Sequence, residues 1–185
     1  DSRRGETRYS YTPTGQLERA EYPDGREQWR KSDQTGNLYP DPDMRLRRYL
    51  GGGRLEQDGE WHCEYDADGN LTERYLGTGR WLDGKKDRWR YRWNADGSLA
   101  KVVRPDKREV EFTYDALGRR LSKSFGTTVT RWVWNGNVPL HQWKQHREYS
   151  VVEDRWHTDT ERRDMTVWLF DEESFVPVAM LKEGR

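Results

Sequence analysis

The fold is decided by residues 110–121, which read VEFTYDALGRRL. Val110, Phe112 and Tyr114 alternate with polar residues, and this period of two is typical of a half-buried strand. The side chain of Asp115 is predicted to close an Asx turn, and Gly118 to supply the positive φ that ends the turn. The chain then reverses into a second strand. The stretch therefore predicts a β-hairpin with a tight, glycine-dependent turn.

Looser copies of this unit occur along the chain. Aligned on their turn glycines, the copies place an aromatic residue four positions before the glycine and a leucine two positions after it. The aromatic residues are Tyr11, Tyr65, Trp93 and Tyr114, the glycines are Gly15, Gly36, Gly69, Gly97 and Gly118, and the leucines are Leu17, Leu38, Leu71 and Leu99. The Gly36 copy lacks the aromatic residue. Leu121 stands three positions after Gly118, so a β-bulge is predicted in that copy.

The repeated unit predicts the fold class. The aromatic residue and the leucine flank one turn, so we expect them to pack across the hairpin. A hairpin this small cannot bury its own apolar face and needs neighbouring copies. We therefore predict an all-β chain of successive antiparallel β-hairpins.

The motif also suggests how the chain is organised. Residues 1–143 are predicted to form the repeat region, with an irregular insertion near residues 39–59, where Pro40 and Pro42 each remove a backbone donor. Residues 144–185 are predicted to add further strands without the motif. The apolar run 166–170 is typical of a strand buried on both faces, so the last third is expected to hold the main core.

Composition favours sheets with wet faces. The chain is 36% charged and 32% hydrophobic, close to the values of disordered proteins, yet 13% of its residues are aromatic. The low hydrophobic content and the high aromatic content fit together if the sheets are held by cross-strand aromatic pairs and not by a thick apolar core. The net charge is zero, so we expect no nucleic-acid partner, and no apolar run is long enough for a membrane span.

The chain is expected to be a piece of a longer protein, because it starts at an aspartate. A piece of an open β-structure exposes unpaired strand edges, so we expect it to self-associate. Cys63 is the only cysteine, which excludes an internal disulfide.

No residues with catalytic, cofactor-binding or metal-binding chemistry are assigned. His62 and Cys63 are neighbours on a predicted strand and would point to opposite faces, so they could not share a proton. The remaining histidines lack Glu or Cys at metal-ligand spacing. Residues 66–70 are similar to a calcium loop, but Tyr75 stands where its glutamate is needed. The sequence therefore predicts a protein that is not an enzyme and has no cofactor.

Two copies of the motif resemble a known family. YDALGRRL (114–121) and YDADGNL (65–71) resemble the tyrosine–aspartate (YD) repeat of Rhs proteins. Residues 51–55, 130–143, 168–171 and 175–179 are similar to the C-terminal half of a bacterial Rhs core. The resemblance implies that the hairpins form part of a curved, spiral β-shell that encloses a C-terminal toxin. Such shells occur in polymorphic toxins, in insecticidal toxin-complex C subunits and in animal teneurins.

The resemblance also implies a function. It is that of a structural segment that encapsulates and delivers a toxin in interbacterial competition, often through type VI secretion. The partners would be the remainder of the shell, the enclosed toxin and secretion-apparatus proteins. The protein would be made in the bacterial cytoplasm and exported within a larger effector. Bacterial Rhs cores typically close with a self-cleaving aspartyl-protease-like motif, which is not found up to Arg185, so no catalytic residue is carried over.

Two alternatives remain open at this stage. The first is a carbohydrate- or cell-surface-binding β module that uses exposed Trp and Tyr side chains, and the second is an enzyme of unrecognised type. Packing separates the first from the shell. Binding tryptophans should be exposed and clustered in a groove, whereas shell tryptophans should be buried between neighbouring strands.

Overall fold

The structure is a computed structural model that describes residues 5–77, 84–171 and 174–183. Its regular elements are β-strands and one short 3₁₀ turn, η1 (Gly51–Gly53). The predicted all-β fold class is therefore confirmed. The chain divides into two compact units, Asp1–Arg88 and Trp89–Arg185, which are described separately.

The first unit consists of antiparallel hairpins in chain order. Its first sheet has the order β1 (Arg8–Tyr11), β2 (Leu17–Glu21), β3 (Glu27–Trp29), and a small sheet pairs β4 (Lys31–Ser32) with β5 (Leu38–Tyr39). The remaining strands are β6 (Arg47–Leu50), β7 (Arg54–Asp58), β8 (Trp61–Tyr65) and β9 (Leu71–Leu76), each paired with the next.

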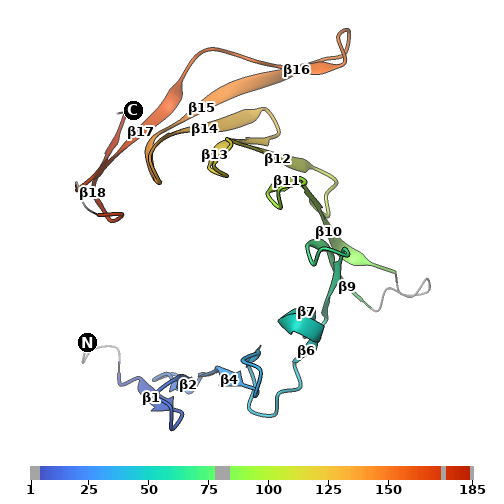
Figure 1. Cartoon of the computed structure of the whole chain (residues 1–185), viewed down its shortest axis with the longest axis vertical. Coiled ribbons are helices and arrows are strands. Elements are labelled where there is room, and N and C mark those ends of the chain that lie inside the picture. Colours follow the sequence, from blue (N-terminus) through green and yellow to red (C-terminus); the bar gives the residue numbers. More distant parts are fainter. Residues whose placement is uncertain (1–4, 78–83, 172–173, 184–185) are drawn as a thin grey trace. The chain divides into compact units, whose positions relative to one another are not determined.

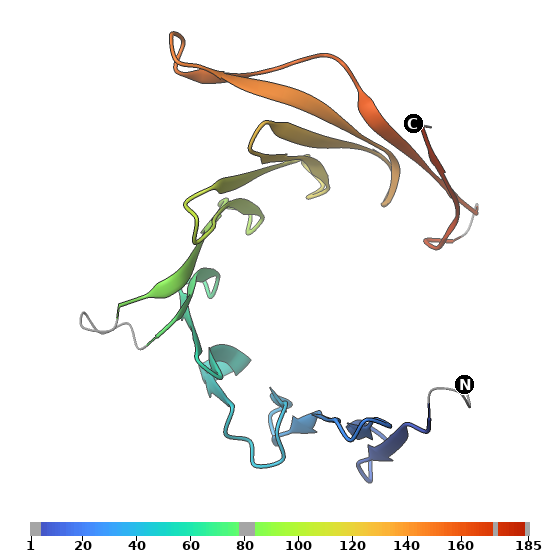
Figure 2. The same ribbon diagram turned by 180° about the vertical axis from the view of Figure 1, so that it is seen from behind.

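The second unit continues the same up-and-down pattern. It contains most of β10 (Lys86–Trp93), then β11 (Leu99–Val103), β12 (Glu109–Tyr114), β13 (Arg120–Phe125), β14 (Thr128–Asn135) and β15 (Val138–Ser150), again paired in chain order (Figure 1). β16 (Arg155–Thr158) pairs with the end of β15, and β17 (Arg163–Phe170) pairs with its middle. β18 (Pro177–Lys182) pairs with β17 and is the last strand of the row. Figure 2 shows the same ribbon from behind.

One backbone turn recurs between these strands. The N–H of its first residue donates to the carbonyl of the fifth, and the N–H of its fourth donates to the carbonyl of the first. Its first residues are Thr12, Tyr22, Asp33, Asp66, Asn94, Arg104 and Asp115. The fourth residue always has positive φ, and it is glycine except in the turn after Arg104, where Lys107 has φ 64°. The repeated turn glycines of the sequence therefore mark one turn geometry.

The apolar core is thin. The buried hydrophobic residues among those described are Ala20, Tyr75, Val102, Val103, Val129 and Trp143, and no described side chain is fully buried. This agrees with the predicted wet faces. The expected core in the last third is wrong, because every residue of β18 is exposed and Leu169 on β17 is 41% exposed. β18 has one neighbouring strand, so its apolar side chains lack cover on one side.

The predicted irregular insertion near residues 39–59 differs from the structure in its second half. Residues 40–46 are turns and bends, but 47–58 form the regular hairpin β6–β7. The interruption of the strand pairing therefore ends before Arg47, where β6 begins. The predicted boundary at residue 143 falls inside β15 and remains a statement about where the motif ends.

Candidate functional site: an aromatic clamp between hairpins

The hairpin turn at Asp115 shows why the motif contains an aspartate. Oδ1 of Asp115 accepts hydrogen bonds from the backbone N–H groups of Leu117 (3.0 Å) and Arg119 (2.9 Å), and Oδ2 accepts one from Nε of Arg119 (2.7 Å). Desolvation raises the pKa of Asp115, but the backbone and side-chain hydrogen bonds from Arg119 lower it by more. The pKa of Asp115 therefore lies below its ordinary value. Gly118 has φ 75°. The charged carboxylate and the glycine together fix the turn.

Asp33 holds its turn in the same way. Its Oδ1 accepts hydrogen bonds from the backbone N–H groups of Thr35 and Asn37, each 2.9 Å long. Desolvation raises the pKa of Asp33, yet the hydrogen bonds from Thr35 and Asn37 bring it down to about 2. The Gly36 copy therefore keeps the turn although it lacks the aromatic residue.

The aromatic residue and the leucine of each motif lie directly opposite each other across the hairpin. The partners are Tyr11 and Leu17, Tyr65 and Leu71, and Trp93 and Leu99. A β-bulge follows each pair, so the predicted bulge is a general feature of the motif. Ser32 takes the aromatic position opposite Leu38 in the Gly36 copy.

The last copy corrects the sequence alignment. Tyr114 lies opposite Arg120, whereas Leu121 is the extra residue of the bulge and is 38% exposed. Arg120 therefore occupies the position that leucine holds in the other copies. Its guanidinium lies 4.7 Å from the ring centroid of Phe112 and 5.9 Å from that of Tyr114, so it covers the aromatic face that a leucine would cover.

The sequence analysis missed one complete copy of the motif. Tyr49 lies opposite Leu55 in the hairpin β6–β7, a bulge follows, and Gly53 has φ 73°. Tyr49 stands four residues before Gly53 and Leu55 two after it, which is the same spacing as in the other copies. The preceding prolines and the run of three glycines concealed this signal.

Aromatic residues at one end of the hairpins bind the hairpin before their own. The hydroxyl of Tyr49 donates to the carbonyl oxygen of Leu38 (2.5 Å), and that of Tyr65 donates to Leu55 (2.7 Å). In the second unit, the hydroxyl of Tyr114 donates to Leu99 (3.0 Å) and Nε1 of Trp134 donates to Arg120 (2.8 Å). In each case the acceptor is the residue at the leucine position of the preceding hairpin. We call this set of four contacts the aromatic clamp.

The clamp explains the choice of aromatic residue. Tyr and Trp combine a large apolar ring with a hydrogen-bond donor at its far end, which Phe lacks. Tyr11 has no preceding hairpin among the described residues, and it is 60% exposed. Trp134 was assigned no role by the motif because its turn has a different length, with Asn135 opposite Val138.

Ion pairs stabilise the face of the first unit. Glu64 and Glu73 lie directly opposite each other on β8 and β9, and Nζ of Lys85 lies 2.7 Å from a carboxylate oxygen of each. Arg88 also binds Glu73. Desolvation opposes the charged form of Glu73, but the hydrogen bonds from Arg88 and Lys85 outweigh it and lower the pKa of Glu73. The lysine thereby offsets the repulsion between two opposed carboxylates.

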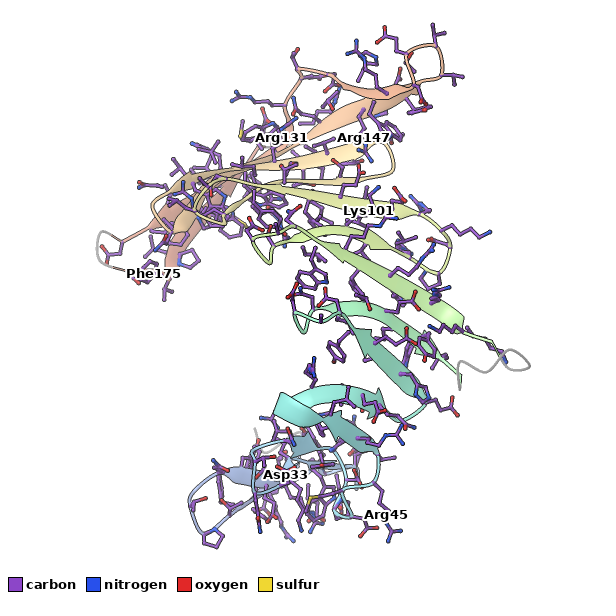
Figure 3. The ribbon with its side chains drawn as sticks, turned by 45° about the vertical axis from the view of Figure 1, so that its right-hand side comes forward. Asp33, Arg45, Lys101, Arg131, Arg147 and Phe175 are labelled. Atoms are coloured by element: carbon purple, nitrogen blue, oxygen red, sulfur yellow. The ribbon has the colours of Figure 1, made fainter. Side chains whose placement is uncertain are left out.

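A buried arginine joins several strands and a loop in the second unit. Arg147 on β15 is 7% exposed and donates from Nε to the carbonyl of Gly126 (2.8 Å) and from Nη1 to Glu111 (3.3 Å). Its guanidinium lies 4.2 Å from the ring centroid of Trp156. Figure 3 shows Arg147, Arg131 and Lys101 among the side chains of this unit. The charged side chains of this unit therefore make packing contacts that apolar side chains make in proteins with a larger hydrophobic core.

The tryptophans are mostly half-buried. Trp143 is buried and Trp156 is 43% exposed, while the other tryptophans of the described residues lie between these extremes. Within residues 5–77, 84–171 and 174–183, no three His, Cys, Asp or Glu side chains gather as metal ligands. None of the described helical segments is long and apolar enough to cross a membrane.

Comparisons with known proteins give the family. The model of the family described as Teneurin YD-shell matches residues 1–135. The chain is 33% identical over 150 residues to "Double-stranded DNA deaminase toxin A" of Burkholderia cenocepacia (strain H111), which covers 74% of this chain and 10% of that protein. It is 26% identical over 121 residues to "Probable deoxyribonuclease RhsB" of Dickeya dadantii (strain 3937), which covers 57% of this chain and 8% of that protein.

A solved structure shares the fold. The Photorhabdus luminescens Tc holotoxin pore with the TccC3-D651A mutation superposes with a TM-score of 0.50 and 13% identity, over 95% of this chain and 9% of that one. The chain thus spans about a tenth of the length of these relatives. The resemblance to Rhs and YD-repeat proteins is confirmed, and with it the prediction of a β-shell fold. The chain belongs to the teneurin YD-shell family.

Proposed function

We propose that this chain is a non-enzymatic structural segment of a shell that encloses and delivers a C-terminal toxin in interbacterial competition. The observation that carries the proposal is the aromatic clamp. Tyr49, Tyr65, Tyr114 and Trp134 all direct their donors to the backbone of a neighbouring hairpin. The most recurrent feature of the sequence is therefore used to join hairpin to hairpin, as a wall requires.

The names of the relatives support the toxin part of the proposal. One relative is named a DNA deaminase toxin and another a probable deoxyribonuclease, and this chain matches about a tenth of each. The chemistry in those names belongs to those proteins. In our proposal this chain belongs to the enclosing wall, and its motif residues, from Tyr11 to Leu121, have structural roles.

The proposed partners and location follow from the same reading. The partners are the remainder of the shell, the enclosed toxin and, for export, secretion-apparatus proteins such as those of type VI secretion. The protein would be synthesised in the bacterial cytoplasm and exported as part of a larger effector. Neither a nucleic-acid partner nor a cofactor is part of the proposal.

The carbohydrate-binding alternative makes a different demand on the aromatic side chains. It requires exposed tryptophans clustered in a groove, whereas the described tryptophans are mostly half-buried and Trp134 is bonded to a neighbouring strand. We therefore prefer the shell. A glycan-array screen of the purified chain would support the alternative if a Trp156→Ala variant abolished a binding signal.

The mass of the intact parent protein and of its products from the native source tests the proposal. We expect a far longer polypeptide together with a separate C-terminal fragment that resists protease until the shell is denatured. A native protein that ends near Arg185, or a C-terminal fragment that is as protease-sensitive as the free fragment, would overturn it. Mass spectrometry detects a native protein that ends near Arg185, and limited proteolysis detects a C-terminal fragment that the shell does not protect.

A further inference from the structure

Two arginines stack on one phenylalanine at the turn between β13 and β14. The guanidinium of Arg108 lies 4.1 Å from the ring centroid of Phe125, and that of Arg104 lies 5.1 Å from the same centroid. Both arginines belong to the turn between β11 and β12. A Cβ at Gly126 would lie 3.2 Å from Nη2 of Arg108, so a larger residue there would crowd this guanidinium. Phe125 and Gly126 therefore hold two guanidiniums of the adjacent turn in place.

A third guanidinium reaches the same place from β15. Arg147 is buried, and its Nε donates to the carbonyl oxygen of Gly126 (2.8 Å). Figure 3 shows Arg147 at the opposite end of the second unit from Phe175. The turn after β11, the turn after β13 and the strand β15 thus bring three arginines to one end of the sheet.

Residues 101–111 and Arg147 carry more cations than carboxylates. The five cations are Lys101, Arg104, Lys107, Arg108 and Arg147, and the three carboxylates are Asp106, Glu109 and Glu111. Each carboxylate is already paired with Lys101, Arg104 or Arg147. We call the five cations, together with Phe125, the basic turn patch. The patch has positive charge that its own carboxylates do not balance.

The unbalanced charge lies on Lys107 and Arg108. Both side chains are exposed, and no carboxylate of the described residues pairs with either of them. A guanidinium that stacks on a ring keeps its in-plane N–H groups available, because the stacking uses only the face of the group. Nε of Arg104 is buried and has no hydrogen-bond partner either. The patch therefore has more N–H donors than acceptors.

These donors fit carboxylates. The planar N–H groups of a guanidinium match the two oxygens of a carboxylate, and stacking on Phe125 reduces the freedom that Arg108 loses on binding. Asp106 and Glu111 already bind two arginines of the patch, so the patch accommodates carboxylates. A nucleic acid fits less well, because its affinity depends on many phosphate contacts and the patch has two unpaired cations.

We propose that the basic turn patch binds a short acidic peptide segment of a partner protein. Arg108 binds one carboxylate through parallel N–H groups, and Lys107, its neighbour in the turn, binds the next. Arg104 and Arg147 keep their own carboxylates and add positive potential that attracts the segment. This inference goes beyond the proposed shell and does not rest on it.

The test is fluorescence anisotropy of a labelled peptide that carries a short run of glutamates, titrated with the whole chain. We expect saturable binding that weakens as the salt concentration rises. The same peptide with glutamine in place of glutamate should not bind. A single-stranded oligonucleotide of the same net charge as the glutamate peptide should bind more weakly than that peptide.

Two variants and a control locate the contact. Arg108→Gln removes the exposed guanidinium and is expected to weaken peptide binding by about tenfold or more. Arg108→Lys keeps the charge without the planar N–H groups, so it should restore binding only in part. Arg30→Gln removes the same charge from an exposed arginine of the first unit and should leave binding unchanged.

Amide hydrogen exchange of the wild-type chain, with and without the glutamate peptide, locates the contact without any variant. We expect added protection in residues 104–108 and 126–127, and protection confined to other residues overturns the inference. Binding of the glutamine peptide, or equal losses in Arg108→Gln and Arg30→Gln, also overturns it. Tighter binding of the oligonucleotide would assign the patch to nucleic acid instead. None of these outcomes bears on the parent protein's mass, which tests the shell separately.

Discussion

The hydroxyl of Tyr114 donates a 3.0 Å hydrogen bond to the carbonyl oxygen of Leu99, which belongs to the preceding hairpin. The bond joins two hairpins at the end where their turns lie, beyond the reach of the ladder between β11 and β12, which runs from Lys101 to Val103 on the β11 side. A sheet with so thin a core depends on such local bonds to hold successive hairpins in register. The clamp is therefore expected to contribute measurably to stability.

Replacing Tyr114 by Phe should destabilise the chain by about 1 kcal/mol, because the carbonyl of Leu99 loses its donor while the ring is kept. Denaturant unfolding followed by tryptophan fluorescence measures the change. Tyr11→Phe is the matched control, since Tyr11 is 60% exposed and has no preceding hairpin among the described residues to which its hydroxyl could donate. Equal effects of the two substitutions would show that the Tyr114–Leu99 hydrogen bond of the aromatic clamp does not contribute to stability.

Gly118→Ala should cost about 1 kcal/mol through backbone strain alone. Gly118 has φ 75°, and a Cβ at this position would meet no atom within 4 Å, so steric overlap does not contribute. Gly51→Ala is the control, because Gly51 does not have positive φ and its Cβ would also meet nothing within 4 Å. Thermal unfolding of both variants separates the effect of φ from that of side-chain volume, and a loss of stability in Gly51→Ala would count against the explanation.

Lys107→Gly should stabilise the chain by about 0.5–1 kcal/mol. Lys107 has φ 64° in the turn position that glycine occupies elsewhere, and relief of this strain exceeds the extra entropy that glycine gives the unfolded chain. Lys123→Gly, in the exposed middle of β13, should instead destabilise. The prediction is wrong if the Lys107 variant unfolds at a lower denaturant concentration than wild type.

Lys85→Met should destabilise the chain by about 1 kcal/mol at neutral pH, because Glu64 and Glu73 then oppose each other without the shared ammonium group. The folded-state pKa of Glu73 lies below its ordinary value of 4.5, so its contribution is complete above that value. The contribution is lost as pH falls through the lowered pKa.

The difference between wild type and Lys85→Met is therefore expected to shrink on acidification below pH 4.5. Denaturant unfolding at a series of pH values measures it. Lys123→Met, which changes an exposed lysine, should show a small difference with no such dependence. A Lys85 effect that stays constant from neutral to acidic pH would exclude the carboxylate pair as its cause.

Local chemistry made much of the fold readable from the sequence. Gly118 and Asp115 specify their turn through backbone conformation and a short-range Asx hydrogen bond, and both effects act within five residues. The alternation of Val110, Phe112 and Tyr114 specifies a strand for the same reason. The spacing of such turns was enough to predict successive hairpins, and the resemblance of residues 114–121 and 65–71 to the YD repeat indicated the family.

The tertiary structure decided what the spacing left open. Arg120, and not Leu121, takes the leucine position, because the pairing register between the strands decides which residue lies opposite Tyr114. The hidden copy at Tyr49 depends on pairing with Leu55 across three glycines, and the clamp depends on which hairpin lies next to which. The exposure of β18 follows from its place at the edge, because burial depends on neighbouring strands and not on the apolar residues of the strand itself.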